Sequence, residues 1–141
     1  MQITIINQQK KIPISKRAIK KLVLKTFKIL KANLAGELTI VYVDNRTIQK
    51  LNYKYLSKPR PTDVLCFDLS EKDRFTGNIV ISTEKAWENS RLFKTSAIWE
   101  TKLYLIHGIL HLLGFKDKRV KDRERMQRKT LQILREISKN Q

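Results

Sequence analysis

The sequence predicts one α+β domain over residues 1–141, in which a small mixed sheet of four strands packs with about five helices. A chain of 141 residues is long enough to bury one core. Strand-like and helix-like segments follow one another in the order β-α-β-α-β-β-α-α-α, without a repeat, linker or low-complexity tract. The helix over 98–113 is the most apolar, so we expect it at the centre of the domain.

The first half of the chain contributes two strands and two helices. Gln2–Asn7 alternates as a strand does, and Ser15 is a suitable N-cap for a helix with an apolar face. That face comprises Ile19, Leu22, Val23, Phe27, Leu30 and Leu34. Gly36 ends this segment, and Leu38–Val43 has the composition of a buried strand. Asp44 then caps a short helix through Ile48, Leu51 and Tyr55.

The second half begins with a loop, because Pro59 and Pro61 break the second helix. Val64–Leu69 and Asn78–Ser82 predict two strands, and the polar residues 70–77 between them predict a turn. Three helices complete the prediction, over about 83–92, 96–113 and 121–137.

The charge of the chain is strongly unbalanced. Thirty Lys and Arg residues against thirteen Asp and Glu residues give a formal net charge of +17. This imbalance favours a polyanionic partner, such as RNA, DNA or acidic lipid. No helix combines a basic face with exposed aromatic residues, so RNA is favoured and a membrane is not.

The cysteine content and the start of the sequence favour a cytoplasmic location. A single cysteine, Cys66, excludes an internal disulfide and fits a reducing compartment. Met1–Asn7 is too short for a secretion signal and lacks its basic residues. No apolar run reaches the length of a membrane span.

The two histidines, His107 and His111, are four residues apart in the most apolar predicted helix. Residues i and i+4 share one face, so both imidazoles can reach one ion. Gly114 can end this helix, and the turn it allows can bring Asp117 back toward the two rings. Two nitrogens and one carboxylate oxygen leave a position for water, as in catalytic zinc sites. The pattern predicts such a site; the alternative is a pair of core or surface histidines.

Zinc peptidases share this histidine spacing but place a glutamate, their general base, directly after the first histidine. Here that position is Gly108, which has no side chain to accept a proton, so a metallopeptidase is the weaker interpretation. Gly108 itself has two interpretations. It leaves space above the metal for substrate, or it lets the helix pack closely.

A dense run of basic residues follows the metal motif. Those nearest to it, which we expect to bind RNA phosphates, are Lys116, Lys118, Arg119, Lys121 and Arg123. A basic rim beside a metal cleft would concentrate RNA, with binding that weakens as salt is added. The same helix has an apolar face, so an ordinary solvated surface is the alternative.

Three stretches carry a recognisable combination of residues. They are His107–Asp117, then Leu51-Asn52 with Tyr55, Pro61–Leu65 and Phe67, and finally Gly77–Ser82. They resemble signatures of the YbeY family of bacterial endoribonucleases, of which the first reads H-G-x-L-H-L-x-G-Y/F-D-H and the third G-D-I-x-I-S. The resemblance implies a zinc-dependent, single-strand-specific endoribonuclease of the cytoplasm. It also implies a role in ribosomal RNA maturation, with ribosomal components as partners.

The resemblance further implies roles for single residues. The family's third metal-ligand histidine falls on Asp117, a conservative change because carboxylate oxygen also binds zinc. Manganese or magnesium becomes less disfavoured with this ligand. The family's active-site arginine falls on Leu56, so Arg60 on the same loop is the candidate catalytic replacement. From their positions alone, Thr62 and Asp63 can hold their loop near the metal through hydrogen bonds, with turn capping as the alternative. Glu100, two turns before His107, can orient a group that supports the metal ligands, with a helix-surface pair as the alternative.

Two positions leave a second function open. If the changes at Leu56 and Asp117 abolish catalysis, the chain is an RNA-binding or ribosome-binding factor on the same fold. Cys66 stands where the family usually has a serine, and we expect it to be a small buried strand residue rather than a ligand.

Overall fold

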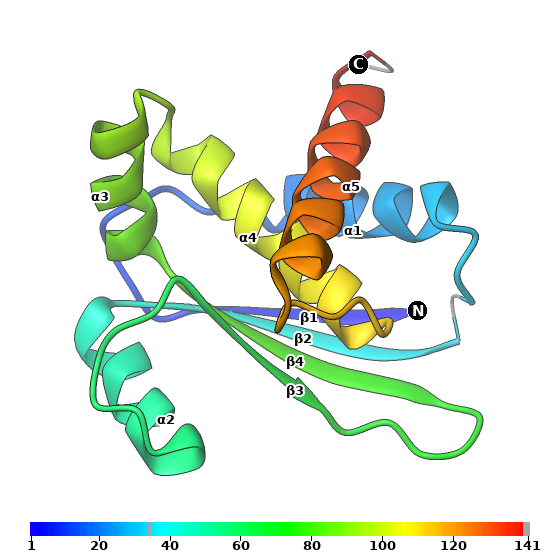
Figure 1. The fold of residues 1–141 in the computed structure, drawn as a ribbon, viewed down its shortest axis with the longest axis horizontal. Helices are drawn as coiled ribbons and strands as arrows, with labels where there is room; N and C mark the ends of the chain where they lie inside the picture. Colours follow the sequence, from blue (N-terminus) through cyan, green and yellow to red (C-terminus); the bar gives the residue numbers. More distant parts are fainter. Residues whose placement is uncertain (34, 140–141) are drawn as a thin grey trace.

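Four strands form one sheet in the order β1-β2-β4-β3 (Figure 1). The structure, a computed structural model, describes residues 1–33 and 35–139. The strands are β1 (Gln2–Asn7), β2 (Gly36–Val43), β3 (Val64–Asp68) and β4 (Phe75–Ser82). β1, β2 and β4 run parallel and β3 runs antiparallel to β4, so the sheet is mixed as predicted. Parallel neighbours need a crossover, and α1 (Lys16–Ile29) supplies it between β1 and β2.

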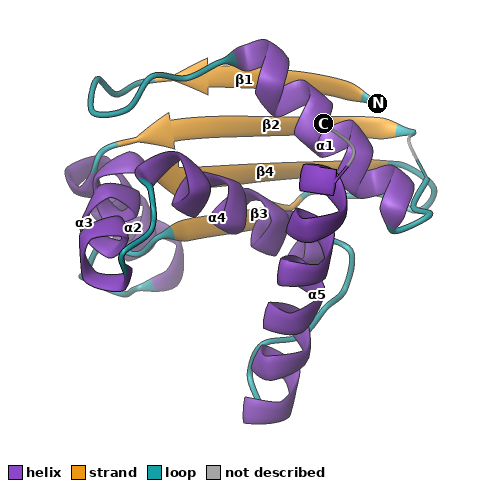
Figure 2. Ribbon diagram, turned by 90° about the horizontal axis from the view of Figure 1, so that it is seen from above, coloured by secondary structure: helices purple, strands orange, loops and turns teal. Residues whose placement is uncertain are grey.

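The helices cover the two faces of the sheet unequally (Figures 1 and 2). One face carries α1, α3 (Thr83–Phe93), α4 (Ala97–Leu112) and α5 (Val120–Lys139), and the other carries α2 (Asn45–Leu56). The larger core lies under the four helices and includes Ile79 and Ile81 of β4. A smaller cluster under α2 includes Val80 of the same strand. Alternate residues of β4 therefore serve the two cores, as the period of a strand requires.

The histidine helix, α4, is buried along most of its length, as its apolar sequence predicts. Its N-cap is Ser96, whose Oγ accepts a hydrogen bond from the Trp99 N–H at 3.0 Å. None of the helices in the described part of the chain combines the length and apolar character needed to cross a membrane.

The order of the elements is as predicted, but some boundaries differ. α1 ends at Ile29, because Lys31 turns the chain with a left-handed φ of 52°. Leu34, expected on the apolar face of this helix, lies outside the described residues. β4 begins at Phe75 rather than Asn78, because its pairing with β2 continues as far as Gly36. Gly36 has a φ of +131°, and a Cβ there would lie 2.0 Å from the Phe75 carbonyl oxygen.

Candidate active site

The C-terminal half of α4 presents both histidines to one pocket. This cavity of about 1080 Å³ is lined by residues of α4, α5, β3 and the loop 57–63. His107 is half-buried in its wall, and His111 is exposed. Because the two residues lie one helical turn apart, both imidazoles face the same space.

Gly114 ends the helix as predicted. Its φ is +102°, and the Phe115 N–H donates back to the Leu110 carbonyl oxygen at 3.0 Å. The chain then turns so that Asp117 lines the same pocket. Arg123 stabilises this turn by donating to the carbonyl oxygens of Asp117 and Lys118 at 3.3 and 3.0 Å.

The predicted metal ligands share the pocket, but their expected convergence on one point is not seen. Among residues 1–33 and 35–139, no three His, Cys, Asp or Glu side chains are placed to hold one ion together. His107 Nε2 instead lies 3.0 Å from Oε1 of Gln127 on α5. Imidazole and carboxylate are suitable donors for zinc, and binding through Nε2 would require His107 to exchange Gln127 for the ion. The ligand set stays a prediction.

Burial lowers the pKa of His107 below its ordinary value. The hydrogen bond with Gln127 and the charges of Asp63 and Asp117 act in the opposite direction and do not cancel this effect. The imidazole is therefore neutral near pH 7, which is the form that binds a metal ion.

The loop between α2 and β3 is fixed from both sides. Asn52, buried on α2, donates to the carbonyl oxygen of Arg60 at 2.8 Å. The Asp63 carboxylate accepts hydrogen bonds from the Val64 N–H at 2.8 Å and the Thr62 hydroxyl at 3.3 Å. Arg60, Thr62 and Asp63 all line the pocket. The hydrogen bonds of Thr62 and Asp63 have two effects. They fix the backbone at the start of β3, and they hold the loop at the cavity wall.

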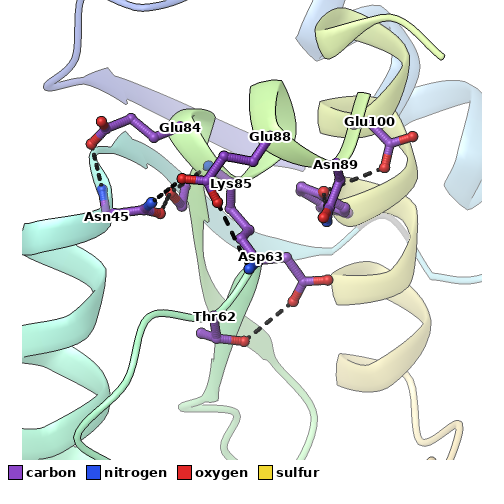
Figure 3. A network of polar contacts seen from close by, with 10 residues as sticks. Asn45, Thr62, Asp63, Glu84, Lys85, Glu88, Asn89 and Glu100 are labelled. Carbon is purple, nitrogen blue, oxygen red and sulfur yellow. Dashed lines mark hydrogen bonds and ion pairs between the residues drawn. The ribbon is translucent and has the colours of Figure 1, made fainter. Parts of the chain in front are cut away.

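Asp63 also contributes negative charge beside the histidine helix (Figure 3). Its carboxylate points toward α4. Its charge adds to the rise in the pKa of Cys66 and partly offsets the fall that burial causes in the pKa of His107. Burial is the larger cause for Cys66, whose pKa rises to about 12. Cys66 is therefore a neutral thiol on β3; it is half-buried rather than fully buried, and it lines the pocket.

Glu100 is the one predicted site residue that lies in the core away from the pocket. It is 3% exposed and accepts hydrogen bonds from the Thr95 hydroxyl at 2.6 Å and the Tyr104 hydroxyl at 3.3 Å. Asn89 of α3 donates to the same Tyr104 oxygen at 2.7 Å. These contacts join α3 to the start of α4, and they give Glu100 a structural position instead of a contact with either histidine.

The basic residues after the motif fall into two groups. Lys118 and Arg123 line the pocket, whereas Lys116, Arg119 and Lys121 are exposed outside its lining. Arg119 Nε pairs with Asp122 at 3.1 Å. Further positive charge lines the pocket from Lys58, Arg60 and Arg128.

Gly108 lets α4 approach the sheet closely. A Cβ at this position would lie 3.0 Å from both Cδ1 and Cγ2 of Ile79 and 3.2 Å from Sγ of Cys66. The packing interpretation of this glycine is therefore supported by direct geometry.

Several polar residues of the pocket were not among the predicted site residues, and they include Asn52, Lys58, Glu124, Gln127 and Arg128. Gln127 reaches His107 from α5, and nothing in its helical context distinguishes it from other exposed polar residues. Asn52 had two usable signals. It belongs to one of the stretches that resemble the family signatures, and it follows Ile48 by four residues, which places an amide on the buried face of α2.

Known proteins are similar to this chain in both sequence and fold. The sequence model of the family described as "Endoribonuclease YbeY" matches residues 4–138. Endoribonuclease YbeY of Christiangramia forsetii is 40% identical over 94 residues, which are 67% of this chain and 66% of that protein. Endoribonuclease YbeY of Syntrophomonas wolfei is 34% identical over 97% of both chains. A solution structure of a Thermotoga maritima protein, 29% identical, matches with a TM-score of 0.65 over 99% of this chain and 93% of that chain.

The family match includes every element that builds the pocket, from α2 and its loop through β3 and α4 to α5. The structural match covers the same elements in the same fold. On this ground, the chain belongs to the YbeY endoribonuclease family.

Proposed function

We propose that this chain is a metal-dependent endoribonuclease that hydrolyses single-stranded RNA during the maturation of ribosomal RNA. Membership of the YbeY family supplies the enzyme class. The composition of the pocket supports metal dependence and a phosphate ester as substrate. Its lining combines His107, His111 and Asp117 with five basic residues, namely Lys58, Arg60, Lys118, Arg123 and Arg128. The first group can bind a metal cation, and the basic residues can bind a phosphate. This combination suits the hydrolysis of an anionic phosphate ester.

The proposed ligands are His107, His111 and Asp117, and the first expected ion is zinc. When bound, a divalent ion of this kind acidifies a water molecule and stabilises charge on a phosphoryl oxygen. A carboxylate in place of a third imidazole removes one positive charge from the site. Manganese or magnesium is therefore the second expectation.

Arg60 is the proposed phosphate ligand of the loop. Its backbone is fixed by Asn52, and its side chain lines the pocket. A guanidinium can donate to two phosphate oxygens at once, so one arginine here both binds and orients the backbone of the substrate. Arg123 is partly committed to the Asp117 turn, which leaves Lys58 and Lys118 for neighbouring phosphates.

The proposed substrate is single-stranded ribosomal RNA, with ribosomal components as partners in the cytoplasm. The resemblance to the family motifs and the net charge of +17 support this setting, because so basic a chain attracts a polyanion. Neither a binding-only factor nor a metallopeptidase is favoured by the family to which the chain belongs.

The test combines metal content with RNA cleavage, on protein purified without an affinity tag. We expect one bound divalent ion per chain and cleavage of a single-stranded ribosomal RNA fragment that stops with a chelator. His111→Ala should remove both properties, whereas Lys72→Ala, on the exposed turn between β3 and β4, should retain both. Cleavage that persists in chelator would contradict the metal mechanism. Tight RNA binding without cleavage would favour the binding-only factor instead.

A further inference from the structure

Helix α1 carries an array of positive charge that the active site does not use. Its exposed residues include Lys16, Arg17, Lys20, Lys21 and Lys28, and Lys25 is half-buried. Residues 16–31 contain no Asp or Glu. The opposite face of the same helix is buried in the larger core, so the array is the outer surface of a firmly packed element.

This charge pattern works against the helix itself. Cations in the first turn oppose the helix dipole, which favours acidic residues there. Lys16 and Lys20, Arg17 and Lys21, and Lys21 and Lys25 are each four residues apart, a spacing at which like charges repel. None of the ion pairs in the described part of the chain involves a residue of α1. The stability of the fold therefore does not explain the array.

The array lies outside the active-site pocket, because no residue of α1 lines it. α1 is on the same face of the sheet as α4 and α5, and it contacts α5 (Figures 1 and 2). α5 in turn contributes Arg123, Gln127 and Arg128 to the pocket. α5 therefore packs against α1 and also contributes to the wall of the pocket.

We infer that the α1 array is a second RNA-binding surface, which holds the phosphate backbone of RNA beyond the nucleotides in the pocket. This inference rests on the proposed function only in taking RNA as the substrate. Closely spaced lysines without acidic partners match the charge of a phosphate backbone, and they read no base sequence. A polyanion on this face would also relieve the repulsion within the helix.

The experiment neutralises the array and compares RNAs of two lengths. The variant is Lys20→Gln with Lys21→Gln and Lys28→Gln; the control is Lys10→Gln with Lys50→Gln and Lys72→Gln, which removes the same charge from exposed sites outside α1 and the pocket. Affinity is measured as a function of salt for a single strand of about 8 nucleotides and one of about 40, the shorter being close to one single-strand site. A melting curve checks the fold, and the array variant should melt no lower than the parent because its lysines no longer repel one another.

For the longer RNA, the array variant should bind about tenfold more weakly or worse, and its salt slope should fall by about 0.7 for each phosphate that the variant no longer neutralises. The control should change much less, and cleavage of the shorter RNA should be unchanged in both. Equally weakened binding in variant and control would overturn the inference, because net charge alone would then explain it. If the array variant binds the longer RNA as tightly as the parent, the inference is also overturned, even if the lysines bind a different partner. Because binding is measured directly, the result stands even if the chain proves inactive as a nuclease.

Discussion

Asp117 supplies the third expected donor of the metal site, at the exposed turn behind Gly114. Asp117→Ala should weaken zinc binding by at least about tenfold, since even an outer partner of a metal ligand is worth that much. Folding stability should change little, because the side chain is exposed. Titration calorimetry and thermal melting measure the two effects separately.

Asp117→His is the matched control for that change. It restores a softer set of three imidazoles, so zinc affinity should be kept or raised. The more positive centre should also lower the pH at which cleavage is half-maximal. If the parent binds no zinc at micromolar levels and Asp117→Ala cleaves RNA as well as the parent, Asp117 is not a ligand.

Gln127 occupies Nε2 of His107, one of the two ring nitrogens through which an imidazole binds a metal ion. Its Oε1 lies 3.0 Å from His107 Nε2, and a net hydrogen bond contributes about 0.5–1.5 kcal/mol. Gln127→Ala removes this competitor, so zinc affinity should rise by up to about tenfold. Gln132→Ala, farther along α5 and bonded to Glu136, should leave affinity unchanged. Weaker zinc binding in Gln127→Ala would show that the amide orients His107 rather than competing for it.

These residues also show what the sequence could and could not reveal about the site. The histidine pair and the Gly114 turn follow from spacing within one helix, and the structure brings both rings and Asp117 to one pocket. The contact between His107 and Gln127 spans twenty positions and depends on how α5 packs, so no local pattern encodes it. The contacts of Glu100 could not be predicted for a related reason. Spacing placed it two turns before His107, but burial and the bonds to Thr95 and Tyr104 determine what it contacts.

At the scale of elements, the close approach of α4 to the sheet depends on Gly108. Gly108→Ala gains up to about 1 kcal/mol of helix propensity but overpacks Ile79, which typically costs about 1–3 kcal/mol. The net effect should be a decrease of about 1 kcal/mol in the free energy of unfolding, measured by denaturant titration. Ile79→Val removes one of the two crowded methyl carbons, so the double variant should be destabilised by less than the two single changes together. A fully additive double variant would mean that α4 shifts to make room.

The types of the elements were predictable because hydrophobic periods differ between helices and strands. Their ends depended on distant partners. β4 starts early because β2 continues to pair with it, and α1 stops early because Lys31 adopts a left-handed conformation that its sequence does not favour. The starts of α2 and α4 were predicted well, since Asp44 and Ser96 accept the hydrogen bonds expected of N-caps.

At the scale of the whole molecule, apolar residues hold the fold together and charged residues serve the surface and the pocket. The larger core and the cluster under α2 hold the sheet, and almost all of the ionic side chains remain at the surface. Asp63, Asp117 and Glu124 bring negative charge to a pocket that otherwise has a basic lining. A cation and an RNA phosphate can therefore be attracted to the same cavity by different side chains.

The basic residues after the metal motif should contribute to RNA affinity according to their position. Lys118→Glu with Lys121→Glu should weaken binding of many single-stranded sequences alike, and the salt slope should fall by about 0.7 for each phosphate that these lysines neutralise in the parent. Lys50→Glu with Lys72→Glu changes the net charge equally at exposed sites far from the motif in sequence and outside the pocket lining, and should have a smaller effect. Arg123→Glu should act differently, because Arg123 also donates to the carbonyl oxygens of the Asp117 turn. Arg123→Glu should lower zinc affinity together with RNA affinity, whereas Lys118→Glu with Lys121→Glu should lower RNA affinity alone.

Equal RNA binding at low salt by the Lys118/Lys121 variant and the Lys50/Lys72 variant would show that the stretch after the metal motif is only a solvated surface.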